Sequence, residues 1–232
     1  MKNRIAWMIA SVALILTMGT KPVAAEQVVL TFEGLKSGEA VDNYYAGGKG
    51  SQGTGPGPNY GITFTGPVVD GQNDAVAYIP SKPFPNDPSP PTVLLLASEF
   101  STIPPGQPIS AYMNVSPGFS GFLGLYYAAI DSDASVQIYS GINGTGTLLA
   151  SMKLPFTSAT TGIFDPNEID VSFSGVARSA VFSGGNQEAA FDDIRLTTPE
   201  PASPVLLLIG GGCALVYRRF QREGRRNAPG VS

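Results

Sequence analysis

From Val28 onward, the sequence is a succession of short runs rich in β-branched and aromatic residues, each ended by Gly, Pro, Asn or Asp. Apolar and polar residues alternate within these runs, which is typical of strands that bury one face. No segment of the body has the 3.6-residue apolar period of an amphipathic helix. The pattern predicts eleven strands, at residues 28–32, 61–65, 75–79, 92–97, 109–115, 121–129, 135–140, 147–154, 168–173, 177–183 and 189–196.

Such short strands and turns favour two packed antiparallel sheets. The 28 glycines and 20 prolines make up about a fifth of the 232 residues, which also favours turns over long helices. We therefore expect residues 26–198 to form an all-β, antiparallel β-sandwich of the jelly-roll kind. A barrel is the alternative that the sequence leaves open.

The first 25 residues have the three parts of a secretory signal peptide. Lys2 and Arg4 precede an apolar run at residues 5–18, and small residues follow it. We expect cleavage between Ala25 and Glu26. The alternative is an uncleaved membrane helix, which the short run and the small residues after it disfavour.

A second apolar run, at residues 205–217, lies near the C-terminus. At about 1.5 Å per residue it would make roughly 20 Å of helix, which is short of the roughly 30 Å hydrocarbon core of a bilayer. Five arginines and one glutamate follow it. The positive-inside rule then predicts a single membrane-inserting helix with the body outside the cytoplasm.

Charge and composition exclude several functions of the body. Residues 26–198 contain sixteen acidic and six basic residues, a net charge of −10, which is unsuited to nucleic-acid binding. The chain has no histidine, and its one cysteine, Cys213, lies in the C-terminal apolar run. A disulfide, a histidine-based zinc site and a Ser-His-Asp triad are therefore ruled out in the body.

The sequence also lacks a Gly-x-Ser-x-Gly elbow and a phosphate-binding glycine loop before a helix. We expect no catalytic residues and no enzymatic activity. A polysaccharide hydrolase is the alternative, because two of the many carboxylates would suffice for that chemistry.

Acidic residues occur near both ends of the body. Glu33 follows the first predicted strand, and Asp192 and Asp193 lie in the last one. Terminal strands commonly pair in a jelly roll, and clustered carboxylates suit calcium. We predict a structural calcium site at these three residues. The alternative is that they are solvated strand residues.

Two long loops stand out, a glycine-rich one at residues 44–59 and a proline-rich one at residues 80–91. Loops of this length can form binding surfaces or be plain surface insertions. Exposed tyrosines bind sugars well, so we name Tyr44 and Tyr45 as candidate ligand-binding residues. Their alternative role is to pack over the core.

The C-terminal region resembles the PEP-CTERM sorting signal of Gram-negative bacteria, in which a Pro-Glu-Pro triplet, an apolar helix and a basic stretch follow one another. The residues that carry the resemblance are Pro199, Glu200, Pro201, Arg218 and Arg219, with the apolar run between them. The resemblance implies cleavage by an exosortase and an association with exopolysaccharide and biofilm.

The body resembles, more weakly, the carbohydrate-binding jelly rolls that precede such signals. The similar segments are Phe-Glu-Gly at 32–34, Asn-Gly-Thr-Gly-Thr-Leu-Leu-Ala at 143–150 and Phe-Asp-Asp-Ile at 191–194. We expect an adhesive or structural protein of the cell surface or extracellular matrix, with polysaccharide as an expected ligand. Its processing partners would be signal peptidase and an exosortase at the cytoplasmic membrane. The alternatives are a polysaccharide hydrolase and a structural protein without a ligand.

Overall fold

The computed structural model describes residues 26–66, 75–82, 84–97, 103–158, 163–165 and 167–198. The predicted signal peptide and the predicted sorting signal lie outside these residues. Within them, no helix is long and apolar enough to cross a membrane. The ten strands are β1 (Glu26–Leu30), β2 (Glu39–Ala40), β3 (Ile62–Thr65), β4 (Ala75–Tyr78), β5 (Val93–Leu96), β6 (Pro108–Ala129), β7 (Ala134–Tyr139), β8 (Leu148–Leu154), β9 (Ile169–Gly185) and β10 (Ala189–Thr198).

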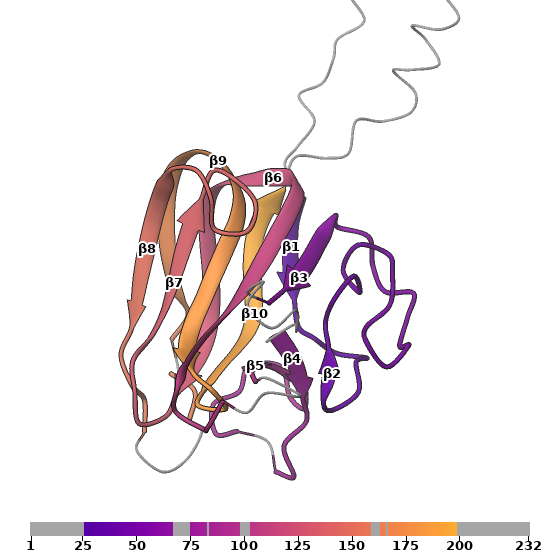
Figure 1. Ribbon diagram of the computed structural model, residues 1–232, viewed down its shortest axis with the longest axis vertical. Coiled ribbons are helices and arrows are strands. Elements are labelled where there is room, and N and C mark those ends of the chain that lie inside the picture. The colour runs from indigo at the N-terminus through magenta and orange to yellow at the C-terminus, as the bar shows by residue number, and fades with distance from the viewer. Residues whose placement is uncertain are drawn as a thin grey trace, which may run out of the picture. The chain divides into compact units, whose positions relative to one another are not determined.

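These strands form one sheet in the order β2-β4-β5-β10-β6-β9-β7-β8, and β1 and β3 pair with β10 and β6. Every ladder between named strands is antiparallel. In Figure 1 the long strands β10, β6 and β9 lie side by side. The predicted all-β, antiparallel class is therefore confirmed.

Two pairs of predicted strands are single long strands. β6 covers the predicted strands at 109–115 and 121–129, and β9 covers the predicted strand at 177–183 and all but the first residue of that at 168–173. The Ser-Pro-Gly segment at 116–118 predicts the end of one strand. In the structure, the pairing of β6 with β9 resumes after irregularities between Asn114 and Gly121. Gly118 and Gly121 take φ of 80° and 87° there, which glycine adopts without strain.

The sheet folds around one large apolar core. The longer strands contribute inward-facing residues to it, as in the buried, half-buried alternation of β7, so one side of the sheet is shielded from water. The largest buried side chains include Phe32, Phe64, Phe119, Phe182 and Phe191. This core fixes which residues of β5, β6 and β10 point to the opposite side.

The first and last strands pair along their length, as expected. Val28 lies opposite Leu196 and Leu30 lies opposite Ile194. The chain leaving β1 therefore begins beside the middle of β10, where the acidic pair of the last strand lies.

Candidate functional site

The side of β5, β6 and β10 that faces away from the main core carries a second apolar cluster. Val93, Ala128 and Ala190 belong to it, and Phe164 packs on them from a separate segment. Two of these three strand residues are alanines, whose short side chains leave space above the sheet here. Partly buried side chains surround the cluster, namely Tyr78, Phe84, Leu95 and Tyr126.

A cavity of about 230 Å³ lies on this side of the sheet. Its lining combines an apolar base, an aromatic wall and a polar rim, contributed by Tyr78, Phe84, Leu95, Ala128, Ile130, Gln187, Glu188 and Ala190. Pockets for drug-sized ligands usually measure about 300–1,000 Å³. This cavity therefore suits a smaller group, such as one sugar ring.

The polar rim comes from the turn between β9 and β10. Gln187 has φ of 62°, a left-handed conformation that non-glycine residues rarely adopt. The Gln187 backbone N–H donates to the Leu96 carbonyl over 2.8 Å, and Glu188 Oε2 accepts from the Ser132 hydroxyl over 3.2 Å. These two hydrogen bonds hold the turn against neighbouring segments. The turn thereby places the Gln187 and Glu188 side chains beside the apolar base.

The aromatic wall depends on the segment between β4 and β5. The Phe84 ring lies 6.2 Å from the Tyr78 ring and 5.9 Å from the Phe164 ring, measured between centroids. The Phe164 amide donates to the Pro85 carbonyl over 3.0 Å, and Asn86 Nδ2 donates to the Phe164 carbonyl over 3.2 Å. The proline-rich segment is therefore packed over the sheet by rings and hydrogen bonds.

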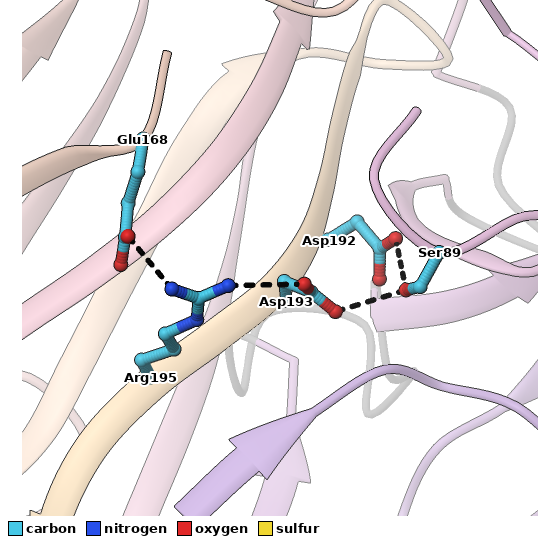
Figure 2. A network of polar contacts seen from close by, with 5 residues as sticks. All are labelled: Ser89, Glu168, Asp192, Asp193 and Arg195. Carbon is cyan, nitrogen blue, oxygen red and sulfur yellow. Dashed lines mark hydrogen bonds and ion pairs between the residues drawn. The ribbon is translucent and has the colours of Figure 1, made fainter. Parts of the chain in front are cut away.

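Four carboxyl groups gather next to this segment, and we call them the carboxyl cluster: Glu33, Asp87, Asp192 and Asp193. Asp192 is fully buried. The Ser89 hydroxyl lies 2.7 Å from Asp192 Oδ2 and 2.9 Å from Asp193 Oδ1 (Figure 2). One hydroxyl proton cannot serve both carboxylates at once, so the cluster has too few donors.

The cation nearest to the cluster compensates only part of its charge. Arg195 contacts Asp193 Oδ2 at 3.3 Å and Glu168 Oε2 at 2.8 Å (Figure 2). Its guanidinium also lies over the Tyr126 ring. By contrast, Asp192 Oδ1 has no hydrogen-bond partner, and neither has either carboxylate oxygen of Asp87. The side-chain oxygens that lack a donor are thus on Asp87 and Asp192.

This arrangement shifts the two carboxyl pKa values upward. Burial, with the nearby Asp87 carboxyl adding to it, raises the pKa of Asp192 from 3.8 to about 9. Burial also raises the pKa of Asp87, and the charges of Glu33 and Asp193 act in the same direction. Both groups therefore hold a proton more tightly than an exposed aspartate does.

An irregularity in β10 places both aspartates on the cluster. Asp193 has φ of 47°, and the pairing of β10 with β6 shifts register between Asp192 and Arg195. In a regular strand two consecutive side chains point to opposite faces, so the irregularity is what allows one serine to contact both carboxylates.

The structure joins two of the three predicted calcium residues through one serine and places the third on a different partner. Asp192 and Asp193 share Ser89, whereas Glu33 accepts from the amide of Thr92 over 3.0 Å. In the described part of the chain, no three Asp, Glu, His or Cys side chains already form a metal-binding set. Sequence reasoning missed Asp87, whose only signal is that it is the one acid in a proline-rich loop.

Tyr44 and Tyr45 do not belong to the cavity. Tyr45 is 3% exposed, and its hydroxyl oxygen accepts from the Phe32 amide over 2.7 Å. Tyr44 is half-buried, packs edge-on against Tyr45 and donates to the Glu33 carbonyl over 3.3 Å. Tyr45 therefore takes the alternative role of a core residue, because its ring has no free face to offer a sugar.

A buried carboxylate organises the glycine-rich loop. Glu39, at 0% exposure, accepts from the amides of Gln52 and Thr54 on Oε1 and from the amide of Lys36 on Oε2, each over 3.0 Å. A Cβ on Gly50 would lie 2.7 Å from Glu39 Oε1, so only glycine fits there. This loop is built around a charge and is not a plain insertion.

We expect Glu39→Gln to lower the free energy of unfolding at pH 7 by about 1.5–3 kcal/mol, because an amide donor would face backbone donors. Burial alone would raise the pKa of Glu39, but the Thr54 hydroxyl and the three amides hold it below its ordinary value of 4.5. The carboxylate's contribution is therefore present above pH 4.5 and lost as pH falls through the lower folded value. Urea unfolding of wild type and variant from pH 3 to 7 would show a difference that shrinks in acid. Equal stability at pH 7 would contradict this role of Glu39.

No protein-family model matches the sequence, and a search of curated proteins finds no match. Solved structures similar to the chain include a family 29 carbohydrate-binding module from Piromyces equi, with 12% identity, a TM-score of 0.40, and coverage of 76% of this chain and 92% of that one. A carbohydrate-binding module from Cellvibrio mixtus lichenase 5A, in complex with cellotriose, has 12% identity and a TM-score of 0.33, and the match covers 59% of this chain and 96% of that one. TM-scores this low do not establish a shared function.

Proposed function

We propose that the described domain is a carbohydrate-binding domain of jelly-roll type, and that its ligand site is the cavity between Phe84 and Glu188. The observation that carries this proposal is the lining itself. A sugar ring has apolar C–H faces and a hydroxylated edge. The rings of Tyr78 and Phe84 and the apolar base suit the faces, and Gln187 and Glu188 suit the hydroxyl groups.

The lining favours binding over hydrolysis. Among the described residues of the cavity wall, Glu188 is the one carboxylate. Glycoside hydrolysis usually needs two carboxyl groups, about 5–5.5 Å apart in retaining enzymes or about 6.5–9.5 Å apart in inverting ones. A single carboxylate that already accepts a hydrogen bond from Ser132 is better suited to holding a hydroxyl group.

A glycan array probed with the purified full chain tests this proposal. We expect selective retention of a group of oligosaccharides, with no change in their mass after prolonged incubation. Shortened products would instead support the hydrolase, and the absence of both binding and turnover would support a structural protein without a ligand.

We also propose that the carboxyl cluster binds Ca²⁺ in the folded protein. Asp87 and Asp192 would supply the charge, and the Ser89 hydroxyl, a hard oxygen donor, lies between Asp192 and Asp193. Calcium takes six to eight oxygen ligands in flexible geometry, so carboxylates without donors are suitable partners. The bound ion would offset the repulsion between the carboxylates and would join β10 to the segment before β5.

Finally, we propose that the chain is exported, held briefly at the inner membrane and sorted to the cell envelope or extracellular matrix. The basis is the signal-peptide pattern and the order of Pro-Glu-Pro, apolar run and arginines in the sequence. Replacement of Pro199 and Glu200 by alanine should leave uncleaved chain in the membrane fraction. Normal processing of this variant would contradict sorting by an exosortase.

A further inference from the structure

The carboxyl cluster and the cavity lie on the same side of the sheet and share one segment. Phe84, which lines the cavity, and Asp87, in the cluster, are three residues apart, and the Asp87 amide donates to the Phe84 carbonyl over 3.2 Å. On β10, Ala190 in the cavity base and Asp192 in the cluster are two residues apart and so point to the same face. A change at the cluster therefore acts directly beside the aromatic wall.

The segment at residues 84–92 is attached at both ends to neighbouring segments of the chain. At its beginning, the Phe84 and Phe164 rings pack together and the Phe164 amide bonds to the Pro85 carbonyl. At its end, the Thr92 amide donates to Glu33 over 3.0 Å. Prolines at 85, 88, 90 and 91 restrict the backbone between these attachments. A displacement of Asp87 would therefore also move Phe84.

The middle of the segment contacts β10 through the Ser89 hydroxyl, which lies 2.7 Å from Asp192 Oδ2 and 2.9 Å from Asp193 Oδ1, whereas no donor contacts the Asp87 side-chain oxygens. Asp192 is completely buried, its Oδ1 faces the cluster without a partner, and both oxygens of Asp87 are buried without a donor. Two neighbouring carboxylates repel each other when both are ionised, and the Ser89 hydroxyl offers them one proton. A shared divalent cation would turn this repulsion into attraction.

We propose that Ca²⁺ bound between Asp87 and Asp192 holds residues 84–92 against β10 and sets the position of Phe84, so that sugar binding in the cavity depends on calcium. This inference rests on the proposed sugar and calcium sites. Calcium acts here as a positioning ion under the aromatic wall, without touching the sugar. The sugar affinity of the protein would then follow the calcium concentration of its surroundings.

Hydrogen exchange measured by mass spectrometry on the full chain, in CaCl₂ or in EDTA, tests the coupling without any sugar. We expect calcium to slow exchange of the Asp87 and Phe164 amides by about tenfold or more in wild type, because local opening becomes rarer. Asp87→Asn should abolish this effect, and Asp170→Asn, at an exposed position on β9, should retain it. Equal exchange of these amides in CaCl₂ and EDTA would overturn the inference.

An oligosaccharide retained by the glycan array then separates this inference from the proposed function. We expect its Kd to rise about tenfold or more in EDTA, the equivalent of about 1.4 kcal/mol. Equal affinity in CaCl₂ and EDTA would overturn the coupling while leaving the sugar site in place. If calcium slows exchange but the chain binds no sugar, the claim that calcium controls sugar binding would be overturned. The claim that calcium orders residues 84–92 would stand.

Discussion

Asp192→Asn is expected to stabilise the metal-free protein at pH 8 and to abolish its stabilisation by calcium. The wild-type carboxylate is fully buried and lacks a partner for Oδ1, so its ionisation is unfavourable. Neutralising such a charge should raise the free energy of unfolding by about 1–4 kcal/mol. At about 2–4 °C per kcal/mol for a domain of this size, the melting temperature should rise by several degrees.

The pH dependence has a definite sign. The folded pKa of Asp192, about 9, lies above its ordinary value of 3.8, so the folded state holds a proton that the unfolded state releases. Stability of the metal-free wild type should therefore decrease as pH rises from about 4 to 9, by up to about 1.4 kcal/mol per pH unit. Calcium should remove this decrease, because an ion bound only by the folded state raises stability by mass action.

Melting curves between pH 5 and 9 in EDTA and in CaCl₂ measure both effects. Asp170→Asn, the same substitution at an exposed position, should melt like wild type and keep its response to calcium. A metal-free Asp192→Asn protein that is less stable than wild type at every pH would show that the ionised carboxylate is needed for folding.

Phe84→Ala should weaken sugar binding by about tenfold or more and leave the fold intact. The ring forms one wall of the cavity together with Tyr78, and truncating an aromatic anchor of a binding site typically costs about 2 kcal/mol or more. Because Phe84 is half-buried in a loop, its loss should affect stability less than the loss of a core phenylalanine.

Titration calorimetry with an array-selected oligosaccharide measures this loss. Phe156→Ala is the matched control, since that ring is 58% exposed and is not part of the cavity lining. Wild-type affinity is expected for this control. A loss of affinity in Phe156→Ala equal to that in Phe84→Ala would place the sugar elsewhere on the surface.

The fold was largely predictable because its signals are local. Period-two alternation marked every long strand, and Gly- and Pro-rich breaks marked most of their ends. The errors arose where long-range pairing overrides a local turn signal. Ser-Pro-Gly at 116–118 would end an isolated strand, but β6 continues through it because β9 lies alongside on both sides of the irregularity.

The candidate site was predictable only in part. Asp192 and Asp193 were predicted as site residues from the expected pairing of the terminal strands, and the pairing of β1 with β10 does make them neighbours of the chain after β1. Asp87 and Phe84 escaped notice because a proline-rich loop carries no periodicity to show which side chains face the sheet. Tyr45 was named as a ligand-binding candidate because it adjoins the glycine-rich loop. A tyrosine in that position can instead use its hydroxyl oxygen to accept from a buried backbone amide, as Tyr45 does from Phe32.

The most direct test of the central claim is a map of where a sugar touches the protein. Hydrogen exchange of the full chain in CaCl₂, with and without an array-selected oligosaccharide, supplies this map. The cavity lining predicts slower exchange in peptides that span residues 78–84 and 187–190, and no change in peptides that span residues 44–59. Protection confined to the glycine-rich loop around Tyr44, with none beside Phe84 and Glu188, would contradict the account.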